Sequence, residues 1–202
     1  MKKPKILNLR PSQFVLGMKE VDAKIEKIRG LDRRGLTVFC REHVIPVVRG
    51  PKNELYVIDH HHFLRACWEM NLDCYSIKII KDMSEKSERV FWKKMMKKGW
   101  TYLRDQFGSG PHPPASLPCD IRYLADDPYR SLVWLLIAEG FIEKLSLPFF
   151  EFKWASFFRS RLKLQLHGKS DFSKILKRAK RLATSRSARG IPGYLPTPRP
   201  LT

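Results

Sequence analysis

The central part of the chain reads YVIDHHHFLRA from Tyr56 to Ala66. The apolar residues before Asp59 are typical of a short strand, whereas those from Phe63 onward recur at helical spacing. A strand is therefore expected to run through a polar cluster directly into a helix. Because a helix N-terminus carries unpaired N–H groups and the positive end of the helix dipole, this junction predicts an anion site.

The hydrophobic periodicity predicts further elements on both sides of this junction. Strands are expected at residues 6–9, 44–48, 55–58 and 74–80, and helices at 19–28 and from His61 or His62 to about residue 70. Pro46 suits a strand entry or an edge strand. The first eighty residues thus read β-α-β-β-α-β, which predicts an α+β fold: a small mixed sheet with helices, followed by an α-helical C-terminal subdomain.

The residues after Asp82 read mainly as helices. We expect one capped by Ser84, one capped by Asp127, an aromatic-rich one after Pro148, and a last one capped by Ser170 or Asp171. The Gly/Pro-rich segment after Ser185 is expected to be disordered. The expected organisation is a core at 1–82, a helical extension of the same domain at 83–168, and a basic helix with a disordered tail at 169–202.

The charge of the chain is strongly positive and unevenly distributed. Its 202 residues contain 39 Lys and Arg against 20 Asp and Glu, a formal net charge of +19. Such a charge predicts a polyanionic partner, which can be nucleic acid, a nucleotide, anionic lipid or an acidic protein. Residues 153–202 hold 13 Lys and Arg and one Asp, so +12 lies there and +7 in the first 152 residues. The polyanion inference therefore applies mainly to the C-terminal region.

The cysteines and the apolar runs indicate the compartment. Cys40, Cys67, Cys74 and Cys119 form no CxxC pair, and we expect them to be buried thiols in a reducing cytosol. The N-terminus lacks the apolar stretch of about 7–15 residues that a secretion signal needs. The run from Leu132 to Ala138 is far shorter than the roughly 20 residues that span a bilayer. We expect a soluble, cytoplasmic protein without a membrane partner.

Two other interpretations of the histidine cluster compete with an anion site. Consecutive residues at a helix start diverge by about 100°, and Ala66 stands where His62 would need an i+4 partner, so no metal ligand set is predicted. Alternatively, Asp59 is a helix N-cap followed by three histidines that face solvent. The residues alone leave that second interpretation open.

Several separated motifs occur in one order along the chain. They are LRPSQ at 9–13 and GMKEV at 17–21, a turn with Arg49-Gly50, VIDHHH at 57–62 with Arg65-Ala66, DDPYRSL at 126–132, and Glu151-Phe152 with Trp154-Ala155. This order resembles the ParB/sulfiredoxin superfamily and, more closely, the bacterial group of ParB-like nucleases. The resemblance runs from about Ile6 to Arg161, which is most of the chain.

The resemblance assigns a phosphate-related role to the turn after the strand. ParB proteins have Gly-Glu-Arg-Arg there, sulfiredoxins have Gly-Cys-His-Arg, and free serine kinases of the superfamily have Asp-Gly-His-His-Arg. This chain has Asp59 to Phe63, DHHHF. Position 61 is not cysteine, which excludes the redox chemistry of sulfiredoxin. His60 replaces the glycine and Phe63 replaces the arginine, whereas Asp59, His61 and His62 keep the kinase-like arrangement.

The resemblance implies an enzyme of phosphodiester hydrolysis or phosphoryl transfer at this turn, acting on a nucleotide or nucleic acid, with Mg²⁺ as a candidate cofactor. Glu20 lies near the position of a catalytic glutamate in the kinases. The expected catalytic residues are Asp59, His61 and Glu20, and the expected phosphate- or nucleotide-binding residues are His60, His61, His62, Arg65 and Arg49. No metal-ligating residue is assigned, and no oligomeric state is predicted.

The alternative is a non-catalytic nucleic-acid-binding module that uses its basic C-terminal region and the Lys-rich face of residues 86–98. Trp92, Trp100 and Tyr102 either stack on bases or pack in the interior. A second set either completes the site or is structural, with Asp127 as a cap and Arg130 paired to Glu151. That set is Asp126, Asp127, Arg130 and Glu151. Gln13 and Lys24 are either buried supports or substrate contacts.

Overall fold

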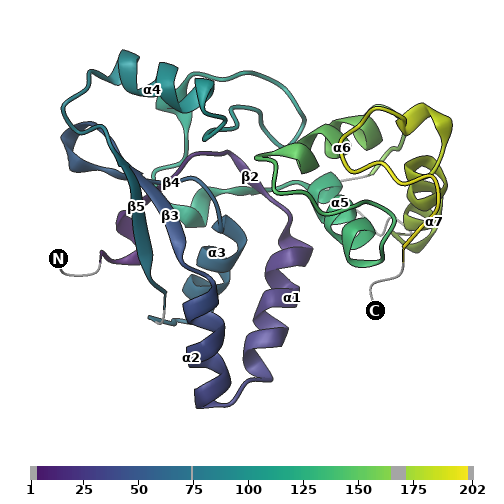
Figure 1. The fold of residues 1–202 in the computed structure, drawn as a ribbon, viewed down its shortest axis with the longest axis horizontal. Coiled ribbons are helices and arrows are strands. Elements are labelled where there is room, and N and C mark those ends of the chain that lie inside the picture. Colours follow the sequence, from purple (N-terminus) through teal and green to yellow (C-terminus); the bar gives the residue numbers. More distant parts are fainter. Residues whose placement is uncertain (1–3, 74, 165–171, 200–202) are drawn as a thin grey trace. The chain divides into compact units, whose positions relative to one another are not determined.

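The computed structural model describes residues 4–73, 75–164 and 172–199 (Figure 1). The chain forms two compact units, Met1–Asp126 and Asp127–Thr202. The first contains a small mixed sheet with helices, and the described part of the second contains helices around a separate hydrophobic core. The predicted α+β class is confirmed. Within the described ranges, no helix combines the length and apolar character needed to cross a bilayer.

The main sheet of the first unit has the strand order β1-β4-β3-β5. Its strands are β1 (Leu9–Pro11), β4 (Leu55–Val57), β3 (Ile45–Arg49) and β5 (Ile77–Asp82). Strand β3 is antiparallel to β4, whereas β1 is parallel to β4 and β5 is parallel to β3. A second, two-stranded parallel sheet joins β2 (Val15–Leu16) to β6 (Ala125–Asp126). The mixed sheet is as predicted.

Pro46 lies on an interior strand, so the edge-strand alternative is wrong and the strand-entry alternative is right. It is the second residue of β3, and the pairing of β3 with β4 begins one residue later, at Val47. The missing N–H therefore falls before the antiparallel ladder starts. The Pro46 carbonyl still accepts a hydrogen bond from the Ile58 amide, at 3.1 Å.

Helices cover both faces of the main sheet. The first unit contains α1 (Met18–Arg29), α2 (Arg33–Glu42), α3 (His61–Glu69) and α4 (Glu88–Lys97). Helices α1 to α3 pack with Val47 and Val57 on one face, whereas α4 packs with Val48 and Tyr56 on the other. Alternation along the strands thus supplies both layers with apolar side chains. Figure 1 shows α4 and the group of α1 to α3 on opposite sides of the strands.

Helices α1 and α3 are where periodicity predicts them, but α2 was not predicted. Its sequence contains Gly35 and the β-branched Thr37 and Val38, which lower helix propensity. Asp32 stabilises its start, because the carboxylate accepts a hydrogen bond from the Gly35 amide at 2.7 Å. The buried Phe39 and Cys40 give α2 its inward side. Tertiary burial and an N-cap therefore outweigh the propensity of this segment.

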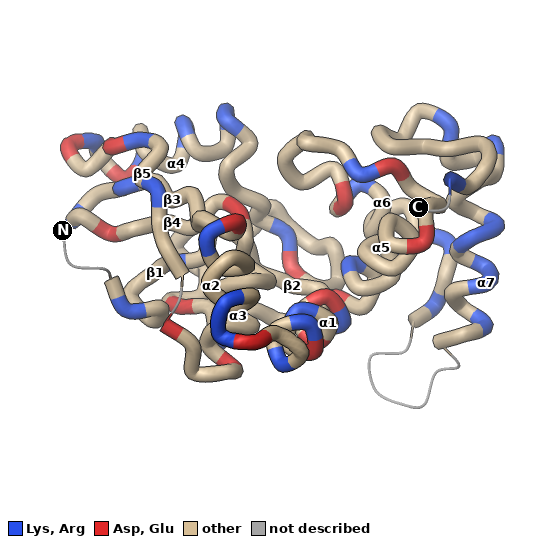
Figure 2. Tube along the Cα trace, turned by 60° about the horizontal axis from the view of Figure 1, so that its bottom comes forward, with Lys and Arg blue, Asp and Glu red and all other residues tan. Residues whose placement is uncertain are grey.

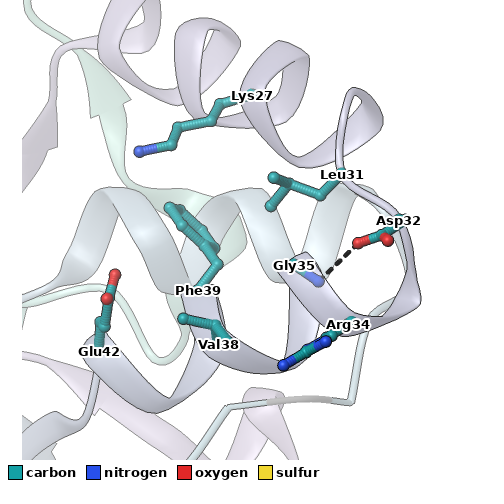
Figure 3. A pocket seen from close by; sticks show the side chains of 8 residues that line it. All are labelled: Lys27, Leu31, Asp32, Arg34, Gly35, Val38, Phe39 and Glu42. Atoms are coloured by element: carbon teal, nitrogen blue, oxygen red, sulfur yellow. Dashed lines mark hydrogen bonds between the residues drawn. The ribbon is translucent and has the colours of Figure 1, made fainter.

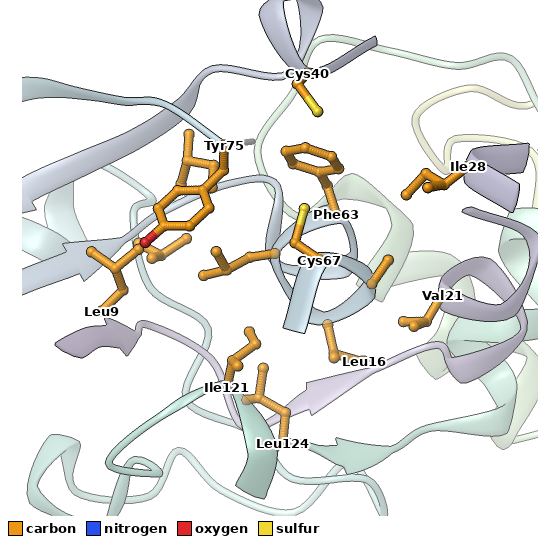
Figure 4. Close-up of a cluster of buried hydrophobic side chains, with 14 of the residues drawn as sticks. Leu9, Leu16, Val21, Ile28, Cys40, Phe63, Cys67, Tyr75, Ile121 and Leu124 are labelled. Atoms are coloured by element: carbon orange, nitrogen blue, oxygen red, sulfur yellow. The ribbon is translucent and has the colours of Figure 1, made fainter. Parts of the chain in front are cut away.

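The core of the first unit surrounds α3. Phe63 and Cys67 of α3 are fully buried, and Figure 4 shows their side chains between residues of α1, β1 and the segment around Ile121. Five buried members of the cluster from these neighbouring segments are Leu9, Val21, Ile28, Ile121 and Leu124. The first residues of α3 are thereby anchored from the inside, which sets where the preceding turn reaches the surface.

The prediction that all four cysteines are buried thiols is wrong for two of them. Cys40 is disulfide-bonded, and Cys119 is a free but exposed thiol. Cys67 is a buried thiol that forms no disulfide, as predicted. Cys74 lies outside the described residues. Sequence spacing carries no information on pairing, and α2, which places Cys40, was itself not predicted.

The second unit contains α5 (Pro128–Ala138), α6 (Phe150–Arg159) and α7 (Phe172–Ala183). Asp127 caps α5, because its carboxylate accepts a hydrogen bond from the Tyr129 amide at 2.9 Å with Pro128 in the first turn, as predicted. Trp154 and Phe158 of α6 are fully buried in the core of this unit. The predicted caps of α7, Ser170 and Asp171, fall outside the described residues.

The segment after Ser185, predicted to be disordered, is ordered to Pro198 and Arg199. The Trp154 indole N–H donates to the Pro192 carbonyl at 2.8 Å, and Leu195 is 5% exposed. Gly193 has φ +82°, and a Cβ there would lie 2.6 Å from the Glu143 carbonyl oxygen. Glycine and proline thus allow an irregular path against the helices, and the few apolar residues of this segment are enough to pack it.

We predict that Leu195→Ala lowers the free energy of unfolding of the second unit by about 2–3 kcal/mol, because it empties a buried position. The matched control is Leu147→Ala, since Leu147 is 54% exposed; its cost should stay below about 0.5 kcal/mol. Urea unfolding followed by tryptophan fluorescence measures both. Equal, small effects of the two substitutions would mean that the segment after Ser185 is disordered.

Candidate functional site

The turn between β4 and α3 holds the predicted polar cluster. His60 has a left-handed backbone conformation, φ 63° and ψ 24°, and the Asp59 carboxylate accepts a hydrogen bond from its amide at 2.6 Å. Glycine adopts this conformation freely, and histidine is among the side chains that tolerate it. The replacement of the superfamily glycine by His60 therefore keeps a glycine-like backbone path and adds an imidazole.

His61 points into the protein. It is 3% exposed, and its Nε2 accepts a hydrogen bond from the Ser12 amide at 3.4 Å. Burial lowers the pKa of His61 to about 3, against the opposing effects of the Asp59 charge and a hydrogen bond to the Val57 backbone. His61 is thus a neutral residue that joins the turn to the segment after β1. This geometry does not favour the phosphate contact expected of it.

His62 and Glu20 are brought together by the packing of α3 on α1. Nε2 of His62 accepts a hydrogen bond from the Gly17 amide at 3.0 Å, so Nδ1 carries the proton of the neutral ring. That Nδ1 lies 3.5 Å from one Glu20 oxygen, and the other oxygen lies 3.4 Å from the Lys24 amine. All three side chains are a quarter exposed or less. The glutamate of the first helix therefore does lie beside the turn.

The two predicted arginines are engaged in other contacts. The Arg65 guanidinium pairs with Glu69 at 2.7 Å and donates to the carbonyls of Ile121 and Arg122, each at 3.3 Å. These contacts fasten α3 to the segment around Ile121. Arg49 pairs with Asp82 at 2.9 Å, where the paired strands β3 and β5 end. In this structure the Arg65 and Arg49 side chains therefore connect parts of the fold to one another.

His43 joins the cluster and was not predicted. It follows the last residue of α2, and its Nδ1 lies 2.7 Å from the Phe39 carbonyl oxygen. A carbonyl only accepts, so Nδ1 carries the proton, and Nε2 has no hydrogen-bond partner among the described residues. The ring centroid lies 5.7 Å from that of His60 and 5.0 Å from that of Phe63. His43 could have been expected beside His60 only if α2 had been predicted from the sequence.

Gln13 and Asp126 are structural supports. Gln13 is 4% exposed and donates to the Val15 carbonyl at 2.7 Å. The Asp126 carboxylate accepts a hydrogen bond from the Met18 amide at 3.0 Å, so it caps the start of α1 from β6. The structural interpretation of the Asp126 set, with its Arg130–Glu151 pair, is supported as well. That pair is seen at 2.6 Å.

The aromatic residues offered for base stacking pack in the first unit. Trp92 contacts the Tyr56 ring, with centroids 5.1 Å apart, and Trp100 packs against the buried cluster that contains Phe91 and Met95. The backbone amide of Tyr102 donates to the Ser12 carbonyl at 3.0 Å. The contacts of Trp92 and Trp100 favour the packing interpretation for these two rings.

A pocket of about 420 Å³ lies between α1 and α2 (Figure 3). Leu31, Val38 and Phe39 form the apolar part of its lining. The Lys27 amine lies 5.1 Å from the centre of the Phe39 ring. The lining residues are Lys27, Leu31, Asp32, Arg34, Gly35, Val38, Phe39 and Glu42. The predicted site residues are not among them, so the candidate turn is separate from this pocket.

Among the described residues, no group of three or more His, Cys, Asp or Glu side chains is arranged to hold a metal ion. His43 and His60 are therefore interpreted as a pair of imidazoles beside one exposed carboxylate, that of Asp59.

The fold and the turn between β4 and α3 agree with the ParB-like family that the motifs resemble. The comparisons with known proteins point to the same family. The solved structure of protein Atu1540 from Agrobacterium tumefaciens is similar to this chain, with a TM-score of 0.85 and 33% identity over 95% of this chain and 96% of that one. A family model described as "Putative ParB-like nuclease" matches residues 3–160. The chain belongs to this ParB-like nuclease family, which indicates a nucleic-acid-related role in coarse terms. No curated protein matches it.

We predict that the stability contributed by His61 depends on pH. Its folded pKa, about 3, lies below the unfolded value of about 6.5, so the unfolded chain binds an extra proton between these values and stability falls as pH falls through them. Relative to pH 7.5, the cost of His61→Gln should shrink by about 2 kcal/mol at pH 5. Urea unfolding at both pH values measures this, with His112→Gln as control. A cost that is independent of pH would contradict a neutral His61.

Proposed function

We propose that this chain hydrolyses phosphodiester bonds at the turn formed by Asp59 and His60, with His43 as the general base. The observation that carries the proposal is the pair of imidazoles, His43 and His60, at the N-terminus of α3. The family supports a nucleic-acid-related substrate, and the pair supplies imidazoles, which can accept and donate a proton.

The start of α3 supports binding of the phosphate. The first turn of a helix has N–H groups without acceptors inside the helix, and the N-cap residue His60 provides no side-chain cap. The backbone of His60 instead bonds to Asp59, which holds the turn in its left-handed conformation. Negative charge that develops on a phosphate oxygen would face the positive end of this nine-residue helix.

The chemical step follows from the tautomer of His43. Its Nδ1 donates to the Phe39 carbonyl, so the lone pair of Nε2 is available to accept a proton from water. As that proton transfers, the water oxygen forms a new bond to phosphorus and the bond to the leaving oxygen breaks. His60, when protonated, gives a proton to the departing alkoxide. The products are a phosphomonoester and an alcohol.

We assign Glu20 as a positioning residue, which revises its expected role as a base. Its carboxylate is shared between the Lys24 amine and His62 Nδ1, and His62 in turn holds the Gly17 amide at the start of α1. A base must have a lone pair directed at substrate, whereas this carboxylate is directed at two partners inside the protein. Glu20, His62 and Lys24 thus fix α1 against α3 beneath the turn.

Mg²⁺ remains a proposed cofactor. It is typically bound by one or two carboxylates together with substrate phosphate oxygens, and it does not require a complete protein cage. Asp59 fits this role, because it is an exposed carboxylate at the turn. When bound, the ion would supply charge neutralisation at the phosphate.

Transfer of a phosphoryl group to an acceptor other than water would use the same residues, and a nucleotide would be its donor. Hydrolysis is the better-supported reaction, because the family model that matches most of the chain is that of a nuclease. A non-catalytic module would need only basic surface and no imidazole pair, so the pairing of His43 with His60 favours an enzyme.

We predict that His43→Ala and His60→Ala each lower kcat at least about 100-fold, the usual contribution of general acid–base groups. The substrates are bis(p-nitrophenyl) phosphate and a short DNA duplex, with and without Mg²⁺. The control is His112→Gln, because His112 bonds to Asp105 outside the turn; it should keep wild-type activity. Circular dichroism verifies folding. Folded variants that retain activity within a few-fold of wild type would refute the assignment.

A further inference from the structure

Helix α7 presents one wholly basic face. Lys174, Lys177, Arg178 and Arg181 follow the spacing i, i+3, i+4 and i+7, so they share one side of the helix, and all four are exposed. Figure 2 shows Lys and Arg along α7 and neither Asp nor Glu. The chain continues with two further exposed arginines, Arg186 and Arg189. We call these six residues the α7 basic face.

The described acidic residues of the second unit do not neutralise the five cations of this face from Lys177 to Arg189. Its described carboxylates each pair with a base: Asp127 with Arg159, Glu139 with Lys180, Glu143 with Arg199, and Glu151 with Arg130. Lys177, Arg178, Arg181, Arg186 and Arg189 take part in no ion pair within the described residues. The positive charge of these five side chains is therefore directed at solvent.

The opposite side of α7 packs against the hydrophobic core of the second unit. Ala179 and Ala183 are fully buried, and Ile175, Leu176 and Leu182 pack against the same core. An amphipathic helix that enters a membrane must insert its apolar side into the lipid. Here that side already holds the unit together, and the basic face contains no apolar anchor. The geometry thus disfavours a lipid surface as the partner.

We propose that the α7 basic face binds the phosphate backbone of double-stranded nucleic acid. From Lys174 to Arg181 the helix rises roughly 10 Å at 1.5 Å per residue. One strand of a duplex carries a phosphate about every 3.4 Å along its axis, so this length matches about three phosphates. Arginine guanidinium groups pair with phosphate through two hydrogen bonds, which suits Arg178 and Arg181.

This inference extends the proposed function by assigning substrate capture to residues that take no part in cleavage. The choice of nucleic acid as the partner rests on that proposed function. Binding and cleavage are nevertheless separable, because the turn and the α7 basic face have no residue in common and each can be changed without the other. Turnover of a small diester such as bis(p-nitrophenyl) phosphate tests the turn, and the change in duplex binding when charges of α7 are removed tests the α7 basic face.

The test measures binding of a fluorescently labelled 24-base-pair duplex by anisotropy, with the full chain, between 50 and 300 mM NaCl. The variant is Lys177→Gln, Arg178→Gln and Arg181→Gln together. The matched control removes the same charge from the exposed side of α4, through Lys93→Gln, Lys94→Gln and Lys97→Gln. Thermal melting checks that both variants fold, and turnover of the small diester checks the turn.

We expect the α7 variant to bind about 100-fold more weakly at 0.1 M salt and to lower the slope of log K against log salt by about 2.7, the value for three phosphate contacts. The α4 variant should lose less than a few-fold, and both should turn over the small diester normally. Equal losses in the two variants, unchanged duplex binding, or binding only to phosphatidylserine vesicles or to an acidic peptide would each overturn the proposal. The turn is tested separately with His60→Ala, which should lose diester turnover and keep duplex binding.

Discussion

The hydrogen bond between the Ser12 amide and the buried ring of His61 is the contact on which the candidate site depends. It connects the segment after β1 to the first residue of α3, two parts of the chain 49 residues apart. An imidazole can accept this bond only in its neutral form, and burial keeps it neutral. This bond, together with the burial of Phe63 and Cys67, fixes the position of the helix start and of the left-handed His60 that precedes it.

Adjacent histidines acquire different roles because their directions differ by about 100° around the helix start. His61 points to the core, and His62 points to α1, where Gly17 and Glu20 occupy both of its nitrogens. His60 precedes the helix and lies beside His43. One sequence run thus provides a buried side chain bonded to the segment after β1, a contact between two helices, and an imidazole beside His43. Environment separates these functions, not residue type.

The strand-turn-helix junction was predictable, since a change of hydrophobic period is a local signal. The approach of Glu20 to the turn was expected only from the resemblance, and the structure shows its cause, the packing of α1 on α3. His43 was not predictable, because α2 has weak intrinsic propensity and is stabilised by burial and the Asp32 cap. The prediction of disorder after Ser185 was wrong for a similar reason. Composition indicated disorder, whereas the burial of Leu195 and the hydrogen bond from Trp154 to Pro192 hold this segment against the helices.

The sequence by itself determined the α+β class, the strand-turn-helix junction that leads into α3, and the concentration of charge near the C-terminus. These properties depend on neighbours within a few residues or on composition alone. Tertiary structure decided which histidine is buried, which arginines are occupied by ion pairs, and which cations of α7 stay uncompensated. Those outcomes depend on contacts between residues far apart in the chain, whose energies of burial and pairing no local pattern encodes.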